Sequence, residues 1–209
     1  MRPVRIRPLS ISGAFVVEPV VHRDDRGEFL EFYRFDRLTE SVGHPLDLRQ
    51  GNISVSRRGT LRGIHFADVP RGQAKYVTVL SGAAIDYVVD LRTGSPTFGT
   101  WEEVPLDPTS HHAVYLAEGL GHAFLALEDD TVLSYLVSDV YRPDREHGVN
   151  PLDPALGIRY PLQALELVVA QKDREAPSLA EATDAGLLPT WAECLRYDQE
   201  RAAESEASR

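Results

Sequence analysis

The chain has 209 residues, of which 43% are hydrophobic and 26% are charged. This length and composition fit one soluble globular domain and exclude the disordered and fibrous classes. The formal net charge of −10 would repel nucleic acid, and no apolar run approaches the ~20 residues that span a bilayer. Because the first residues also lack the apolar core of a signal peptide, we expect a cytoplasmic protein that binds neither nucleic acid nor membrane.

The charge is distributed unevenly along the chain. Residues 1–75 hold 13 Lys and Arg against 9 Asp and Glu, whereas the remainder holds 9 against 23. The basic first third is consistent with an anionic ligand, although solvated surface arginines would give the same pattern. The single cysteine, Cys194, excludes an intramolecular disulfide and a thiolate metal cluster.

Secondary-structure signals, taken in chain order, predict an all-β protein with helices only near its ends. A short helix is expected over residues 36–42. Apolar residues then alternate with period two over residues 76–80, 84–91, 113–116, 122–127 and 131–137, separated by Gly, Pro and Asp turns. This spacing predicts antiparallel strands in a sandwich or barrel, with a core over about residues 45–145.

The end of the chain shows a second kind of signal. Ser178 and Glu181 form a capping-box pattern that predicts a helix start. Beyond Arg196 the sequence is polar and low in complexity, so it lacks the apolar surface needed to order itself. We therefore expect a single domain over residues 1–196 and a frayed helical tail over residues 197–209.

One histidine stands out in the segment Thr60-Leu61-Arg62-Gly63-Ile64-His65-Phe66. A histidine in an apolar strand is more often a core residue than a catalyst. With a carboxylate partner, however, an imidazole of pKa ~6.5 becomes an oriented general base near neutral pH. Asp173 is a candidate partner, although an aspartate after a lysine is usually a solvated charge and the spacing does not show that the two residues meet.

Three further polar residues lie at the start of or inside apolar strands. Lys75, one of only two lysines against 20 arginines, opens the alternation over residues 76–80 and could stabilise an enolate oxygen as a point charge. Tyr135 shares strand parity with the apolar residues around it and should face the barrel interior, as a buried hydroxyl or as a proton donor. Asp86 is a carboxylate in an apolar strand and needs a partner. A strand-edge lysine is an equally good reading of Lys75.

Other site types lose support. The chain has no His-x-His pair, and the neighbours His111 and His112 would point to opposite faces of a strand, so a metal site is disfavoured. It also lacks the glycine-rich dinucleotide fingerprint, the P-loop and the esterase elbow, which removes support for dehydrogenase, kinase and esterase functions.

Five motifs, in this order and spacing, resemble the dTDP-4-dehydrorhamnose 3,5-epimerase family: Asp25-Arg26-Gly27-x-Phe29-x-Glu31, Gln50-x-Asn52-x-Ser54, Leu61-Arg62-Gly63-Ile64-His65-Phe66, Gly94-Ser95-Pro96-Thr97-Phe98-Gly99 and Glu118-Gly119-x-Gly121-His122-x-Phe124. The likeness runs from about Ile11 to Asp173. It implies a cupin-type jelly-roll β-barrel with short flanking helices, a homodimer with one site per subunit, and no metal or organic cofactor.

The same resemblance implies roles for particular residues. The catalytic set would be His65 as general base, Asp173 as its partner, Tyr135 as the acid on the opposite sugar face and Lys75 as the enolate stabiliser. Arg62 and His122 would bind the sugar with Asp86 in support. The nucleotide-diphosphate side would be lined by Arg26, Phe29, Glu31, Gln50, Asn52 and Tyr141. Arginines suit a diphosphate because their planar fork gives bidentate, charge-assisted hydrogen bonds.

The sequence departs from the commonest family pattern at two places. Glycine stands between Gln50 and Asn52, where aspartate is usual, and Asp139-Val140-Tyr141 replaces a cluster of aromatics. Residues 70–76 and 146–154 look closer to the branches that make antibiotic deoxysugars, some of which invert only one carbon. These differences leave open whether C3, C5 or both are inverted.

We therefore expect an isomerase that epimerises dTDP-4-keto-6-deoxyglucose or a close derivative through an enolate. Two alternatives stay open from the sequence. One is a cupin-fold dTDP-sugar 3,4-ketoisomerase, whose motifs fit these segments less well. The other is a non-catalytic barrel that binds nucleotide sugars, which would be expected to lack the base or the acid.

Overall fold

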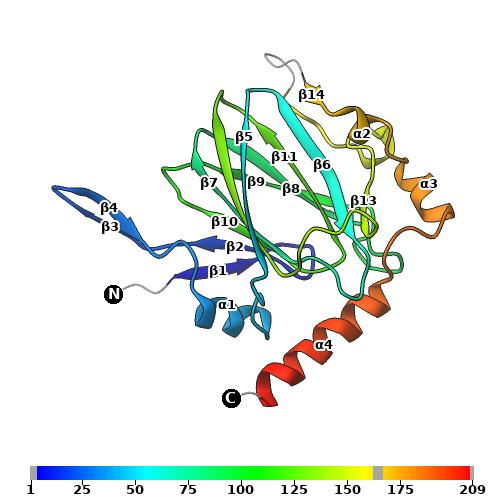
Figure 1. The fold of residues 1–209 in the computed structure, drawn as a ribbon, viewed down its shortest axis with the longest axis horizontal. Helices are drawn as coiled ribbons and strands as arrows, with labels where there is room; N and C mark the ends of the chain where they lie inside the picture. The colour runs from blue at the N-terminus through cyan, green and yellow to red at the C-terminus, as the bar shows by residue number, and fades with distance from the viewer. Residues whose placement is uncertain (1–3, 162–166, 208–209) are drawn as a thin grey trace.

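The computed structural model describes residues 4–161 and 167–207, and its ribbon is built on two facing antiparallel sheets (Figure 1). The first sheet contains, in spatial order, β1 (Arg5–Pro8), β2 (Ala14–Glu18), β10 (Ala113–Leu116), β7 (Lys75–Ser81), β12 (Thr131–Val137) and β5 (Gln50–Ser56). The second contains β13 (Glu146–Gly148), β6 (Thr60–Ala67), β11 (Leu120–Ala126), β8 (Ala84–Asp90) and β9 (Trp101–Leu106), and β14 (Val168–Val169) pairs with β6 in parallel.

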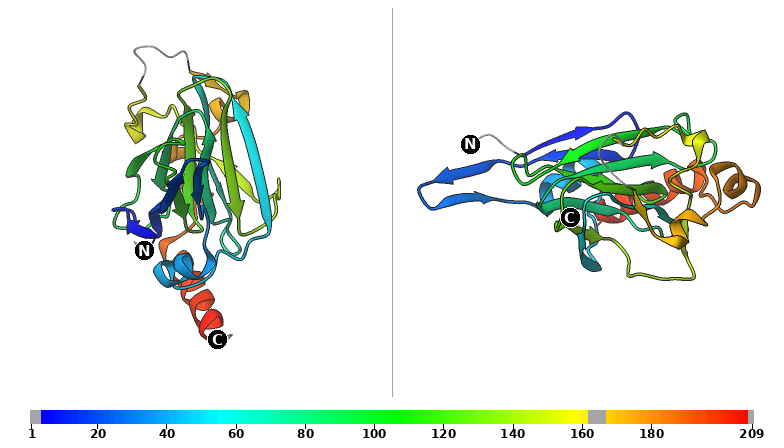
Figure 2. Two further views of the ribbon diagram at one scale, coloured as in Figure 1. Left: turned by 90° about the vertical axis from the view of Figure 1, so that its left-hand side faces the viewer. Right: turned by 90° about the horizontal axis from the view of Figure 1, so that it is seen from above.

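The sheets pack face to face, as the two layers in Figure 2 show. Inward-facing side chains of both sheets form one buried cluster that includes Val77, Val114, Phe124 and Leu133. The outer face of the second sheet packs against the chain that follows the barrel, including Leu156. Because alternate residues of a strand point to opposite faces, one row of each strand builds the core between the sheets and the other its outer surface.

The predicted antiparallel strands are all present. β10 and β12 have the predicted boundaries, while β7, β8 and β11 differ from prediction by one or two residues at their ends. The sequence did not predict β1, β2, β5, β9, β13 or β14, nor the hairpin of β3 (Val21–Asp24) and β4 (Gly27–Leu30), whose strands are short and mostly exposed. None of the helices in the described ranges has the length and apolar character that crossing a membrane requires.

The helices lie at the two ends of the chain, as predicted. α1 (Phe35–Val42) covers the outer face of the first sheet through buried Leu38. After the barrel come the 3₁₀ turn η1 (Pro154–Leu156), α2 (Gln171–Arg174) and α3 (Leu179–Asp184), which starts with the predicted Ser178–Glu181 capping box. The expectation that all flanking helices are short needs correction, because α4 (Trp191–Ala207) has 17 residues.

The tail expected to fray after Arg196 forms the second half of α4. Asp198 accepts a hydrogen bond of 2.9 Å from the imidazole of buried His44, and Arg201 donates to Glu118 at 2.8 Å. These contacts anchor α4 beneath the barrel, where Figure 1 shows it in red. The anchored chain therefore extends at least to Arg201, and the expected division at Arg196 does not match these contacts. That residues 1–196 form one domain remains a prediction.

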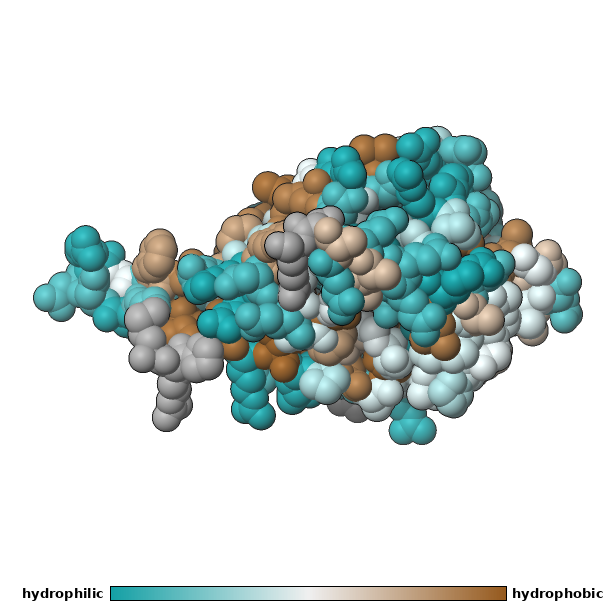
Figure 3. All heavy atoms as spheres, turned by 90° about the horizontal axis from the view of Figure 1, so that it is seen from below, coloured by the Kyte–Doolittle hydropathy of each residue, from teal (hydrophilic) through white to brown (hydrophobic). Residues whose placement is uncertain are grey.

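The β3–β4 hairpin projects away from the body of the molecule. In Figures 1 and 2 it extends sideways from the end of the barrel, and Glu28 in β4 accepts a hydrogen bond of 2.9 Å from His111 in the loop before β10. Phe29 on this hairpin is 70% exposed, and Phe32 and Phe35 at its base are about half exposed. Figure 3 shows apolar atoms gathered where the hairpin joins the body. An isolated two-stranded hairpin is marginally stable in water, so this one needs a further surface to pack against.

Candidate active site

One end of the space between the sheets is hollow and forms a cavity of about 720 Å³. Inward-facing residues of β6 and β11 line one side, and those of β5, β7 and β12 line the other. Its lining includes Gln50, Asn52, Ser54, Arg62, His65, Gln73, Lys75, His122, Phe124, Tyr135, Tyr141, Glu146, Lys172 and Asp173. The structure thus brings nine of the thirteen residues implied by the family resemblance to the lining of one cavity.

His65 and Asp173 form a hydrogen-bonded pair at this cavity. The imidazole Nε2 of His65 lies 2.8 Å from Oδ1 of Asp173, and the backbone N–H of Gly63 donates to Oδ2 at 3.4 Å. Burial opposes ionisation of Asp173, but the hydrogen bond and charge of His65 outweigh it and lower the pKa of the carboxyl. Because ionised Asp173 accepts the Nε2 proton, the Nδ1 atom of His65 keeps a free lone pair.

A second imidazole–carboxylate pair stands beside the first. His122 in β11 is the direct strand partner of His65, so both side chains face the interior. The Nε2 of His122 donates to Oδ2 of Asp86 at 2.6 Å, and both residues are buried. Asp86 is absent from the lining, so it supports His122 from behind. Its Oδ1 atom has no hydrogen-bond partner among the described residues.

Tyr135 reaches the cavity from the facing sheet. It lies in β12 and packs on the core with Leu133, as strand parity predicted. Its ring stands edge-on to His122, with 6.0 Å between centroids, and its hydroxyl shares a hydrogen bond of 3.1 Å with Ser54. Burial raises the pKa of this phenol well above its ordinary value, although the hydrogen bond with Ser54 acts in the opposite direction. Tyr135 therefore holds its proton across the physiological range.

Lys75 begins β7 on the same sheet as Tyr135 and is 7% exposed. Its ammonium donates one hydrogen bond, of 2.6 Å, to Oε1 of Gln73. Burial lowers the pKa of Lys75, and the charges of Glu146 and Glu118 partly oppose that shift. An ammonium with so few protein partners can give its remaining N–H donors to an oxygen in the cavity.

The outer part of the cavity carries the polar residues expected near the nucleotide. Gln50 and Asn52 share the inward face of β5 and are joined by a hydrogen bond of 2.7 Å. The backbone N–H of Tyr141 donates to Gln50 at 2.9 Å, and Tyr141 is 61% exposed. Arg62 in β6 also lines the cavity but is exposed, and it donates to Ser56 at 3.2 Å.

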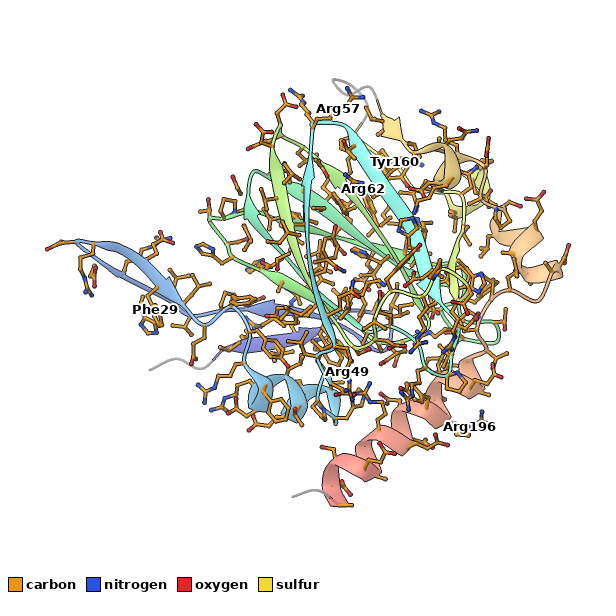
Figure 4. The ribbon with its side chains drawn as sticks, in the orientation of Figure 1. Phe29, Arg49, Arg57, Arg62, Tyr160 and Arg196 are labelled. Carbon is orange, nitrogen blue, oxygen red and sulfur yellow. The ribbon has the colours of Figure 1, made fainter. Side chains whose placement is uncertain are left out.

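Arg26, Phe29 and Glu31 lie outside the cavity. Arg26 and Phe29 are on β4 or its turn and Glu31 follows it, and Figure 4 shows Phe29 far from Arg62. Arg26 forms an exposed ion pair with Asp24 at 2.6 Å. Within one subunit, therefore, the structure does not join these three residues to the rest of the predicted site.

The cavity is also lined by residues that the sequence reasoning did not assign, four of which are Ser54, Gln73, Glu146 and Lys172. The period-two pattern could have found Ser54, because it shares the parity of Gln50 and Asn52 in one strand. The other three lie at strand ends or in a short helix, where alternation carries no signal.

The two adjacent histidines lie outside the strands, so the expectation that they would point to opposite faces of a strand does not apply to them. His111 and His112 lie in the loop before β10, and His111 has a positive φ of 53° and donates to Glu28 at 2.9 Å. Across residues 4–161 and 167–207, no group of three or more His, Cys, Asp and Glu side chains is arranged to hold a metal ion.

Comparison with known proteins gives consistent likenesses. A family model described as dTDP-4-dehydrorhamnose 3,5-epimerase matches residues 8–181. A relative named dTDP-4-dehydrorhamnose 3,5-epimerase, from Mycolicibacterium smegmatis, is 54% identical over 191 residues, covering 91% of this chain and 94% of the relative. A relative named dTDP-4-dehydro-6-deoxyglucose 3-epimerase, from a Streptomyces species, is 50% identical over 197 residues, covering 94% and 100%.

Solved structures give the same result. A 3'-monoepimerase from Streptomyces bikiniensis, crystallised with dTDP-quinovose, superposes with a TM-score of 0.92 at 49% identity, covering 94% of this chain and 99% of that one. A 4-keto-6-deoxy sugar epimerase from the novobiocin gene cluster of Streptomyces spheroides gives 0.89 at 54% identity, covering 91% and 95%. These likenesses confirm the predicted all-β jelly-roll class.

Proposed function

The chain belongs to the dTDP-4-dehydrorhamnose 3,5-epimerase family, and from that premise we propose that it epimerises a dTDP-4-keto-6-deoxyhexose at C3, C5 or both. It is an isomerase of the nucleotide-sugar epimerase class. One observation carries the proposed mechanism: His65 and Tyr135 come from opposite sheets and face one cavity that also holds Lys75. A base and an acid on opposite sides of a sugar ring are what inversion of a carbon requires.

The chemistry begins at the C4 ketone, which acidifies the protons on C3 and C5. We assign His65 Nδ1 as the base that removes one of these protons, leaving an imidazolium whose charge is stabilised by Asp173 at 2.8 Å. The electron pair of the broken C–H bond forms the enolate, with negative charge on the C4 oxygen. The ammonium of Lys75 is the group that we assign to this oxygen.

Inversion follows when the proton returns from the opposite face. Tyr135 is a suitable donor because its buried phenol stays protonated until carbon accepts the proton. The resulting phenolate regains a proton while His65 loses the one that it took, so the enzyme returns to its starting state. Every step moves a proton, and the balance requires no oxidant or reductant.

The experiment that tests this proposal is NMR of dTDP-4-keto-6-deoxyglucose with the enzyme in deuterated water. Loss of the C3 and C5 proton signals is followed separately, together with the configuration of the product. Exchange at both carbons would identify a 3,5-epimerase, and exchange at one would identify a monoepimerase. No exchange at either carbon, with a folded protein and dTDP binding intact, would contradict the proposed function for this substrate.

The pH dependence tests the role of Lys75. Its lowered pKa means that the ammonium is lost as pH rises through a value below the ordinary ~10.4 of lysine. Tyr135 is not the cause of this loss, because burial raises its pKa. We expect kcat to fall on the basic side at a pH below that value. In Lys75→Arg the residual activity should keep no such basic limb, because a guanidinium stays protonated; an unchanged limb would contradict this role.

We also propose that the protein is a homodimer in which the β3–β4 hairpin completes the partner's site. Arg26, Phe29 and Glu31 are expected on the nucleotide side, yet their hairpin points away from the cavity of its own subunit. The outer face of the first sheet offers a surface for a second copy, because Ile53 and Val55 in β5 are 68% and 58% exposed. Exposed apolar residues grouped on one sheet face are typical of protein interfaces.

Replacing Val55, which does not line the cavity, with glutamate should convert the dimer into a 23.2 kDa monomer, measured by light scattering after gel filtration. The affinity for dTDP should fall about ten- to a hundredfold, because charged hydrogen bonds from the partner's hairpin, each about 1.5–3 kcal/mol, would be lost. Leu187→Glu, at an apolar residue after α3 that is 39% exposed, is the control and should remain dimeric. A wild-type monomer, or a monomeric variant that binds dTDP normally, would refute this arrangement.

A cytoplasmic location and the absence of nucleic-acid binding remain predictions from the sequence. The absence of an organic cofactor rests on the family resemblance, and the absence of a metal rests on that resemblance and on the lack of a His-x-His pair. Dialysis against a chelator, followed by the exchange assay and metal analysis of the protein, would test it.

A further inference from the structure

A buried carboxylate that the proposed mechanism does not use lies close to Lys75. Glu118 is in the turn between β10 and β11, is 5% exposed, and faces away from solvent. Taking an unpaired carboxylate out of water costs several kcal/mol, so Glu118 needs partners. Two are found among the described residues: the hydroxyl of Ser138 donates to it at 3.0 Å, and the guanidinium of Arg201 donates at 2.8 Å.

The cation comes from the C-terminal helix. The side chain of Arg201 in α4 is 11% exposed, and its second nitrogen donates to the carbonyl of Pro45 at 2.7 Å. One turn earlier, Asp198 accepts a hydrogen bond from His44, which pins α4 to the loop after α1. Arg201 is therefore held in place at the carboxylate, in contrast to Arg196, which is 65% exposed on the same helix and labelled in Figure 4.

Glu118 is connected in turn to the segment that carries Lys75. Ser138, which donates to Glu118, accepts a hydrogen bond of 2.8 Å from the backbone N–H of Ala74. Gly72 packs directly on Glu118, because a Cβ atom at Gly72 would lie 2.5 Å from the Cβ of Glu118. Glu118 therefore contacts the segment 72–74, which immediately precedes Lys75, at both ends. It packs against Gly72 and is linked to Ala74 through Ser138.

We propose that Arg201 is a positioning residue for Lys75, acting from the C-terminal helix through Glu118 and Ser138. This inference rests on the proposed function, because it concerns the ammonium assigned to the enolate oxygen. Arg201 fixes the carboxylate, the carboxylate and Ser138 fix residues 72–74, and Gln73 in that segment accepts the hydrogen bond of Lys75. The polar end of the chain thus contributes to the site without touching substrate.

The same chain of contacts has an electrostatic effect on Lys75. The charged groups that face its ammonium are Glu146 from β13 and Glu118, and Arg201 faces Glu118 from α4. Removing the negative charge of Glu118 disfavours the ammonium form. Removing Arg201 leaves that charge uncompensated, so its field at Lys75 strengthens and the ammonium form is favoured. A purely structural role for α4 predicts neither effect.

The test measures kcat, KM and their pH profiles, in the exchange assay, for Arg201→Gln, Arg201→Lys, Glu118→Gln and the double variant Arg201→Gln with Glu118→Gln. Arg201→Gln should lower kcat about ten- to a hundredfold, because misplacement of a reacting group by about 1 Å has that effect, while KM changes less. The basic limb should move to higher pH in Arg201→Gln and to lower pH in Glu118→Gln. The double variant should follow Glu118→Gln, and Arg201→Lys should recover most of the loss.

Arg196→Gln is the matched control on α4 and should behave like wild type. A wild-type protein without exchange activity would contradict the proposed function, and no pH profile could then be compared. Failure of the proposed function is therefore distinguishable from failure of the role assigned to Arg201. With an active wild type, an Arg201→Gln variant that melts at lower temperature but keeps the wild-type kcat and basic limb would overturn the inference. If Arg201→Gln does not fold, an unshifted basic limb in Glu118→Gln would overturn it equally.

Discussion

Replacing His65 with alanine should abolish exchange of solvent deuterium at every carbon that the wild type exchanges. The same imidazole is assigned to each proton abstraction, because its Nδ1 is the free nitrogen of the pair with Asp173. A positioned general base contributes about 10²- to 10⁴-fold, and kcat for epimerisation should fall by at least that factor. The loss should appear in kcat and leave dTDP affinity nearly unchanged, since the diphosphate side of the cavity is intact.

His112→Asn provides a histidine control outside the cavity, because His112 lies in the loop before β10 and does not line the site. Its exchange rates should equal those of the wild type. Asp173→Asn should fall between the two, because the amide can still hold the ring but no longer stabilises the imidazolium. If His65→Ala retained exchange at C3 or at C5, another base would have to serve that carbon, and His122 beside it would be the next residue to replace.

Much of the fold is readable from the sequence because local pattern and tertiary environment agree there. The segment 131–137 is rich in β-branched and apolar residues, and its structure is a strand whose Leu133 and Tyr135 share the core face. The hairpin of β3 and β4 lacks such a signal, because both of its faces are exposed and its residues are mostly charged. The stability of such strands depends on the surface against which they pack. The hydrophobic pattern of the strands themselves does not identify that surface.

The site divides in the same way. The strand parity of Tyr135 gives its direction, so its place in the cavity follows from the sequence. The pairing of His65 with Asp173 joins residues 108 positions apart, and only the return of the chain to the open end of the barrel brings them together. That pairing was a matter of family resemblance, and no spacing rule could have supplied it.

The C-terminal tail shows a different limit. The composition of residues 197–209 is polar, as predicted. Composition carries no information, however, on buried Glu118, which accepts a hydrogen bond from Arg201. A polar segment can become ordered when one of its charged residues forms an ion pair with a buried residue of opposite charge. Here the ion pair with Arg201 offsets the free-energy cost of burying the Glu118 carboxylate. The expected boundary at Arg196 therefore does not match these contacts, because the ordering of α4 depends on Glu118, which lies far away in the sequence.

Tyr135→Phe should separate deuterium exchange from inversion. The phenylalanine ring can keep the packing of the tyrosine beside His122 and Phe124, so the cavity should retain its shape. His65 can still remove the proton, and it can return deuterium to the same face. We therefore expect deuterium at C3, C5 or both with configuration retained, while formation of the inverted product falls about 10²- to 10⁴-fold, the contribution of a positioned general acid.

Tyr87→Phe is the matched control for this substitution. The hydroxyl of Tyr87 is buried in β8 without a hydrogen-bond partner among the described residues, and the ring does not line the cavity. Removing it should leave both exchange and inversion at wild-type rates, since an unsatisfied buried group is lost and no partner is stranded. Inversion at the wild-type rate in Tyr135→Phe would show that the second proton comes from elsewhere. Equal loss of exchange and inversion would show that Tyr135 acts before the enolate forms, and either result would overturn its assignment as the acid.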